Sequence, residues 1–179
     1  MHTNIKQILV SEEEIEQRCR QLGQQITEDY KGDDEPPVLV AILKGSVPFL
    51  VKLIKYIDLD IEFDFMDVSS YEGTESIGDV RIIKDLDRSI KNDKILLVED
   101  IVDTGRTIKV VKKMLENKGA IDVKIVSLLD KPSRRVIEVV ADYVGFTIPN
   151  EFVVGFGLDF NEKYRNLPYV GILKDECYK

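Results

Sequence analysis

Three acidic side chains lie within five residues after one apolar segment of the chain. Glu99 and Asp100 follow the run ILLV at residues 95–98, and Asp103 completes the stretch VEDIVDTGRT. Carboxylates this close raise one another's pKa and resist desolvation unless a cation or hydrogen-bond donors compensate their charge. The pattern therefore indicates a ligand that supplies a cation, hydroxyl groups or both.

The stretch DTGRT, residues 103–107, leads from the acids into a helical pattern. Its glycine allows close approach of the backbone, and free N–H groups at a helix N-terminus favour a phosphate. We call these residues the phosphate loop. A phosphorylated sugar suits both features, because its hydroxyls or a bound Mg²⁺ meet the acids while its phosphate meets the loop. The alternative is a solvated acidic turn that caps a helix, but a cap needs one Asp and not three acids.

Helical and strand patterns alternate along the chain. Ser11 and Glu14 form a capping box before apolar positions at helical spacing, which predicts a helix over residues 12–30. Further helices are expected after residues 46 and 107, and the second should stop at Gly119. Apolar runs predict strands at residues 38–43, 61–65, 80–83, 95–98 and 123–129. Strands joined by helices at this spacing form right-handed units of a parallel sheet.

The predicted fold class is α/β, with a twisted, mostly parallel sheet flanked by helices. Residues 1–179 are expected to form a single domain, given their number. In open α/β sheets ligands bind outside the carboxyl ends of the strands. The three acids, Lys44-Gly45 and Lys131 all follow such strands, so we expect them to share one cleft.

Composition limits the partners and the compartment. A net charge of −8, with 44% hydrophobic and 32% charged residues, is typical of a globular protein and makes nucleic acid a poor general partner. Cys19 and Cys177 fit neither a disulfide framework nor a zinc motif. The start MHTNIKQILV lacks the apolar segment of a signal peptide, and no apolar run approaches ~18 residues. We expect a cytoplasmic protein with neither membrane nor nucleic acid as partner.

The segment ILLVEDIVDTGRT resembles the phosphoribosyl pyrophosphate motif of the purine phosphoribosyltransferases. The resemblance extends over nearly everything from residue 38 onward, in the family's order, through LVAILKGSVPF, DVSSYEG, RIIKDLD, SLLDKPSRR and FVVGFGLDFNEKYRNLPYVG. It is strongest toward the bacterial hypoxanthine or hypoxanthine-guanine enzymes of purine salvage. It implies the type I phosphoribosyltransferase fold with a small hood built from the terminal segments.

The implied reaction moves the 5-phosphoribosyl group from phosphoribosyl pyrophosphate to a 6-oxopurine, hypoxanthine or guanine, giving IMP or GMP and pyrophosphate. By resemblance Glu99 and Asp100 would hold the ribose hydroxyls with a Mg²⁺ ion close by. Asp103 would be the general base that takes the proton from purine N7 as N9 attacks C1′. The 5′-phosphate would be bound by the phosphate loop, namely Asp103, Thr104, Gly105, Arg106 and Thr107.

The resemblance also assigns the remaining ligand contacts. Lys44 and Gly45 would form the pyrophosphate loop, where the family often has a cis peptide after Leu43, and Arg165 would contact pyrophosphate. Lys131 would donate to the exocyclic oxygen of the purine. Asp159 would be a second Mg²⁺ ligand beside the purine, Phe152 would stack on the base, and Val153 would offer backbone groups to its edge. The family's lid would span residues 69–79, with the pair Ser70 and Tyr71.

Each of these residues has a plainer interpretation by pattern alone. Lys44-Gly45-Ser46 could be an ordinary strand-to-helix turn, and Lys131 a solvated loop lysine. Residues 152–154 read as a core strand, and Asp159 and Arg165 as surface charges.

Two other classes of protein share part of the pattern. A response-regulator receiver also has an apolar strand followed by an acidic pair, but that motif normally begins the domain and here it arrives at residue 95. A regulatory relative that binds nucleic acid should have a basic face and altered base positions, whereas the chain is acidic and keeps Asp103 and Lys131. A homodimer or homotetramer is implied by the family resemblance.

Overall fold

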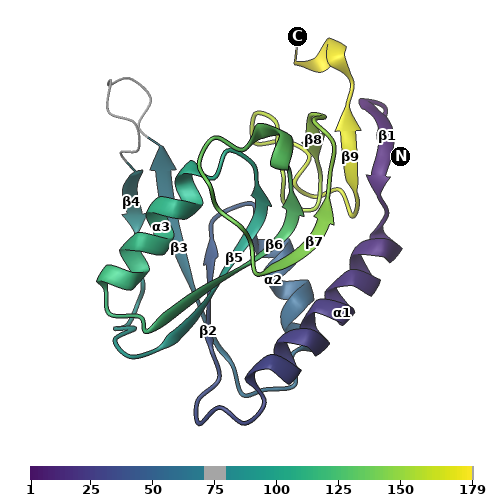
Figure 1. Ribbon diagram of the computed structural model, residues 1–179. Helices are drawn as coiled ribbons and strands as arrows, with labels where there is room; N and C mark the ends of the chain where they lie inside the picture. The colour runs from purple at the N-terminus through teal and green to yellow at the C-terminus, as the bar shows by residue number, and fades with distance from the viewer. Residues whose placement is uncertain (71–79, 179) are drawn as a thin grey trace.

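The computed structural model describes residues 1–70 and 80–178, and a six-stranded sheet lies at its centre (Figure 1). The strand order is β4-β3-β2-β5-β6-β7. Neighbouring strands pair in parallel except at one edge, where β4 runs antiparallel to β3. The strands are β2 (Val38–Ile42), β3 (Glu62–Ser70), β4 (Val80–Lys84), β5 (Lys94–Val102), β6 (Asp122–Asp130) and β7 (Tyr143–Thr147). The predicted fold class, a mostly parallel sheet with flanking helices, is confirmed.

Helices cover both faces of this sheet. Helices α1 (Glu12–Tyr30) and α2 (Val47–Leu53) pack on one face, and α3 (Arg106–Asn117) packs on the other. Side chains alternate between the faces, so Leu96 of β5 joins the core under α1 while Leu97 joins the core under α3. Burial on both faces explains why the central strands are continuous apolar runs in the sequence.

A second sheet joins the two ends of the chain (Figure 1). Its antiparallel order is β1-β9-β8, formed by β1 (Ile5–Val10), β8 (Val153–Val154) and β9 (Val170–Leu173). A small apolar cluster that includes Ile5, Val154 and Leu173 lies beneath it. Short 3₁₀ turns complete the described elements, η1 (Ile54–Tyr56), η2 (Pro132–Arg134) and η3 (Asp175–Cys177). The division into one domain with a hood stays a prediction.

Local signals place the helix ends correctly. The Ser11 side chain accepts from the N–H of Glu14 at 3.2 Å, and the Glu14 carboxylate accepts from the N–H of Ser11 at 2.8 Å. Helix α3 ends before Gly119, whose φ of 99° is left-handed. There the N–H of Ala120 donates to Leu115 and that of Gly119 to Glu116, which satisfies two terminal carbonyls.

Several boundaries differ from the sequence-based expectation. Strand β5 does not end at Val98 but continues through the acids to Val102, because Glu99 and Val102 pair with Ser127 and Asp130 of β6. Strand β2 ends at Ile42, and the Leu43–Lys44 peptide is cis, a point that the sequence alone did not decide. Helix α2 stops at Leu53 and continues as the turn η1.

Only the first two residues of the predicted lid, Ser69 and Ser70, are described. Residues 71–79, including Tyr71, lie outside the described residues, and Ser70 is the last residue of β3. Within residues 1–70 and 80–178, no helix is long and apolar enough to cross a membrane.

Candidate active site

The last residues of strand β5 include Glu99 and Asp100, which lie at the carboxyl edge of the sheet. Glu99 is 8% exposed and Asp100 is half-buried. Burial, reinforced by the charges of Asp100 and Asp103, raises the pKa of Glu99 well above its usual range. Burial also raises the pKa of Asp100 to about 6; the backbone N–H of Ile101 and the charge of Arg165 oppose this rise and that of Asp159 adds to it. The acids therefore need a cation or hydrogen-bond donors before both can ionise.

The turn after β2 lies directly against these acids. A Cβ built on Gly45 would fall 1.7 Å from the carboxylate Oδ2 of Asp100, so any larger residue at this position would displace one of the two. Strands β2 and β5 are neighbours in the sheet. Their carboxyl ends therefore bring Lys44-Gly45 and the acidic pair together, as the sequence predicts.

The phosphate loop connects β5 to α3. Gly105 caps the helix with a φ of 80°, and Arg106 and Thr107 begin its first turn. The carboxylate of Asp103 accepts a hydrogen bond from the N–H of Thr104. A cavity of about 150 Å³ is shared by the acids and the loop, lined by Glu99, Asp100, Ile101, Val102, Asp103, Gly105, Thr107 and Ile108. Carboxylates and helix N-terminus therefore face one space, while Arg106 is exposed.

Lys131 is not a solvated loop lysine. It is 6% exposed, and its ammonium donates to the carbonyl oxygen of Glu151 at 2.6 Å. Burial and the charge of Arg134 lower its pKa, while the charges of Asp103 and Glu151 raise it. A buried ammonium with donors to spare lies at the end of β6, next in the sheet to the strand that carries the acids.

Phe152 belongs to an aromatic cluster of the second sheet. Its ring stacks on Tyr178, with centroids 4.7 Å apart, and meets Phe160 edge-on at 5.6 Å. Val153 starts β8 and is buried against β9. One face of the Phe152 ring is therefore covered by the protein.

Asp159 and Arg165 are partners of each other. Arg165 bonds the Asp159 carboxylate at 3.0 Å and the carbonyl oxygen of Gly157 at 2.8 Å. Glu162 links this pair to the turn after β2, because it contacts Arg165 at 3.3 Å and Lys44 at 3.1 Å. Sequence reasoning missed Glu162. Its position follows from the left-handed backbone of the loop, with φ values of 52° and 63° at Asn161 and Glu162.

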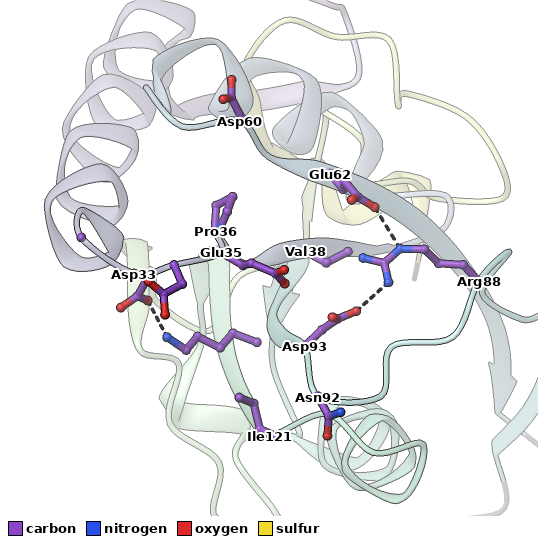
Figure 2. Close-up of a pocket in the computed structure, with 13 residues that line it drawn as sticks. Asp33, Glu35, Pro36, Val38, Asp60, Glu62, Arg88, Asn92, Asp93 and Ile121 are labelled. Atoms are coloured by element: carbon purple, nitrogen blue, oxygen red, sulfur yellow. Dashed lines mark hydrogen bonds and ion pairs between the residues drawn. The ribbon is translucent and has the colours of Figure 1, made fainter.

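A larger cavity lies at the opposite edge of the sheet, where β2, β3 and β5 begin. It measures about 620 Å³, and Figure 2 shows Arg88 between Glu62 and Asp93, with ion pairs of 2.9 and 2.7 Å. Lys94 pairs with Asp33 at 2.7 Å beside it. Its lining includes none of the residues that the sequence predicts for the site. Chemistry, rather than size, identifies the smaller cavity at the carboxyl edge as the candidate site.

Comparisons with known proteins identify the family of the chain. The family model described as phosphoribosyl transferase domain matches residues 6–161. A hypoxanthine-guanine phosphoribosyltransferase of Lactococcus lactis subsp. lactis is 58% identical over 175 residues, which cover 97% of this chain and 94% of that protein.

Solved structures give the same family. A crystal structure of a hypoxanthine phosphoribosyltransferase from Staphylococcus aureus has a TM-score of 0.95 and 53% identity, covering 100% of this chain and 97% of that one. A Trypanosoma cruzi hypoxanthine phosphoribosyltransferase, in complex with the product IMP, has a TM-score of 0.94 and 38% identity over 99% of both chains.

These matches show that the chain belongs to the phosphoribosyltransferase family, within its hypoxanthine and hypoxanthine-guanine branch. It is therefore an enzyme of the glycosyltransferase class, and neither the receiver nor the regulatory interpretation is retained.

Proposed function

We propose that the chain transfers the 5-phosphoribosyl group of phosphoribosyl pyrophosphate to N9 of hypoxanthine or guanine. The products are IMP or GMP and pyrophosphate. The observation that carries the proposal is the cavity shared by the carboxylates of Glu99 and Asp100 and a glycine-containing helix N-terminus. A sugar that carries both hydroxyls and a phosphate satisfies both halves of this cavity.

The phosphoribosyl group is held from two sides. The N–H groups of residues 104–107 and the positive end of α3 bind the 5′-phosphate, and the hydroxyls of Thr104 and Thr107 add donors. Glu99 and Asp100 accept hydrogen bonds from the two ribose hydroxyls. Donation from the sugar reduces the charge repulsion between these neighbouring acids.

The donor set of the site fits Mg²⁺ that arrives with pyrophosphate. Within the described part of the chain, no group of three or more acidic, histidine or cysteine side chains could hold a metal by itself. Mg²⁺ is commonly bound through one or two carboxylates, with substrate phosphates and water completing its shell. Glu99, Asp100 and Asp159 would provide its carboxylate ligands; burial, to which the charge of Asp159 adds, raises the pKa of Asp100 and so favours a cation beside it. When bound, Mg²⁺ neutralises charge on the pyrophosphate.

Pyrophosphate is oriented by groups around the turn after β2. Gly45 offers its N–H, and Lys44 and Arg165 provide positive charge. The side chains of Lys44 and Arg165 both contact the carboxylate of Glu162. Pyrophosphate therefore displaces this carboxylate when it binds to the two cations. Ser70 and Tyr71 belong to the lid that excludes water from the reacting C1′.

The purine lies between β6 and the second sheet. Lys131 has three N–H donors, of which Glu151 takes one, so another donates to the 6-oxygen of the base. Phe152 stacks on the ring, and Val153 and Asp159 lie along its edge. Asp103 takes the N7 proton as the N9–C1′ bond forms and pyrophosphate departs with the bonding electrons of its C1′–O bond.

The proposal is tested by turnover of the purified protein with Mg²⁺ and phosphoribosyl pyrophosphate. Hypoxanthine and guanine should each give the nucleotide, separated by chromatography, whereas adenine should give none because it has no 6-oxygen. Absence of IMP and GMP would contradict the proposal.

We further propose that the protein is a homodimer or homotetramer and lies in the cytoplasm, where the thiols of Cys19 and Cys177 stay free. Light scattering measures the number of subunits.

A further inference from the structure

Arg135 packs against the phosphate loop, and its guanidinium donates hydrogen bonds to oxygen atoms of the protein. Its Nε donates to the carbonyl oxygen of Asp103 at 2.9 Å, and Nη2 donates to that of Val102 at 3.1 Å. Nη2 also bonds the carboxylate of Asp130, and Nη1 bonds the carbonyl oxygen of Val139. The side chain is 17% exposed, so most of it is removed from solvent. Four protein oxygens accept hydrogen bonds from this one residue, and that of Val102 also accepts from the backbone N–H of Lys131 at 2.9 Å.

The two residues after Arg135 extend the same contact. The N–H groups of Val136 and Ile137 both donate to the carbonyl oxygen of Thr104, each at 3.0 Å. Gly105 packs on this segment, because a Cβ there would lie 2.7 Å from the carbonyl oxygen of Ile137. Residues 135–137 therefore contact one side of the phosphate loop.

These bonds determine where the amide groups of the loop point. The carbonyls of Val102, Asp103 and Thr104 all face Arg135 and the two residues after it. In a planar trans peptide the N–H of the next residue points the opposite way. The N–H groups of residues 103–105 therefore point away from Arg135. The Asp103 carboxylate lies on that opposite side, since it accepts from the N–H of Thr104.

We propose that Arg135 is a positioning residue of the reaction. Its guanidinium holds the carbonyl oxygens of Val102 and Asp103, and the two residues after it hold that of Thr104, all on one side of the phosphate loop. The amide donors and the Asp103 carboxylate then face the substrate, which Arg135 itself does not touch. The inference rests on the function proposed above. Lysine cannot replace Arg135, because a single ammonium lacks the planar fork that reaches several acceptors at once.

Two charge-conserving variants separate this role from others. Arg135→Lys is compared with Arg134→Lys, because the neighbouring Arg134 is exposed and carries the same charge. Arg135→Lys should raise the KM for phosphoribosyl pyrophosphate roughly tenfold, as expected when hydrogen bonds that orient the loop are lost. The KM for hypoxanthine should change by less than about twofold, and Arg134→Lys should match the wild type in both constants.

A rise in the KM for phosphoribosyl pyrophosphate without a rise in the KM for hypoxanthine distinguishes a positioning role from a purely structural one. If Arg135→Lys lowered thermal stability but left both kcat and the KM for phosphoribosyl pyrophosphate within about twofold, Arg135 would serve folding alone and the inference would be overturned. Should that variant not fold, Asp130→Asn removes the charged acceptor and keeps the guanidinium. It should raise the same KM roughly threefold, and an unchanged KM would overturn the inference. A wild-type protein without turnover would instead overturn the proposed function, and this inference with it.

Discussion

Lys131 and Glu99 carry ionisable groups where little water reaches them, at 6% and 8% exposure. Burial lowers the pKa of the lysine and raises that of the glutamate, so both are pushed toward their neutral forms. The charged form of the lysine is stabilised by a hydrogen-bond acceptor, and that of the glutamate by a cation or hydrogen-bond donors. In the proposed function, a purine oxygen is the acceptor for the ammonium, and Mg²⁺ or sugar hydroxyls are the partners of the carboxylates.

Lys131→Gln tests the first of these pairings. The change removes a charged donor to the 6-oxygen and leaves a buried acceptor unpaired, at a cost of ~1–3 kcal/mol. The KM for hypoxanthine should therefore rise, and the preference over adenine should narrow. Steady-state rates with both bases measure this, with the exposed Lys6→Gln in β1 as control. An unchanged preference would place Lys131 outside the base pocket.

Asp103→Asn tests the proposed general base. The substitution keeps shape and polarity but removes basicity, and general-base help typically contributes ~10²–10⁴-fold. We expect kcat to fall roughly 10²-fold while the affinity for phosphoribosyl pyrophosphate changes little, because the proposed phosphate contacts come from backbone N–H groups. Rates and direct binding are measured on one preparation, beside the exposed Asp122→Asn. Turnover at the wild-type rate would make Asp103 a structural cap.

Elements whose signals are local were predictable from the sequence. Helix α1 has the bounds given by its capping box and apolar spacing, and α3 stops at its glycine. Elements that depend on distant partners were not. Strand β1 pairs with β9 across almost the whole chain, and the last residues of β5 count as strand because β6 extends beside them.

The same limit applies to the candidate site. Its acids, the phosphate loop and Lys131 could be placed at strand ends from sequence alone, because parallel strands bring their carboxyl ends to one edge. Glu162 could not, since its contacts with Lys44 and Arg165 need a left-handed backbone that no local pattern announces. Arg135 was missed because three of its four acceptors are backbone carbonyls, which have no signature in a sequence.

Gly119→Ala tests the end of α3. A left-handed φ of 99° is unfavourable for alanine, and its Cβ would lie 3.2–3.4 Å from Lys91 atoms. We expect the free energy of unfolding to fall by about 1 kcal/mol or slightly more. Gly32→Ala is a matched control, because Gly32 has a φ of 100° with no atom within 4 Å of the added carbon. Urea unfolding of both variants separates backbone strain from crowding, and equal losses would show that Lys91 adjusts freely.

At the scale of the whole molecule, the acidic cluster links stability to pH and to ligand. The folded-state pKa of Asp100 is raised to about 6, above its unfolded value, so between these values the native state binds more protons than the unfolded state. Stability therefore falls as pH rises through this window, because ionisation then places charge in a buried site. The same ionised site is the one that a cation stabilises.

We therefore expect the ligand-free protein to lose stability between about pH 4 and pH 6.5, by a contribution from Asp100 on the order of 1–3 kcal/mol. Urea unfolding at several pH values measures this, and Asp100→Asn should lack that contribution. At pH 7.5, Mg²⁺ with phosphoribosyl pyrophosphate at roughly a hundred times its Kd should restore ~2.7 kcal/mol. Asp100→Asn should gain less than the wild type from Mg²⁺ with this ligand, because one metal-binding carboxylate is missing. Equal pH profiles in the two proteins, together with equal stabilisation by the ligand, would show that Asp100 neither titrates in this window nor contributes to the metal site.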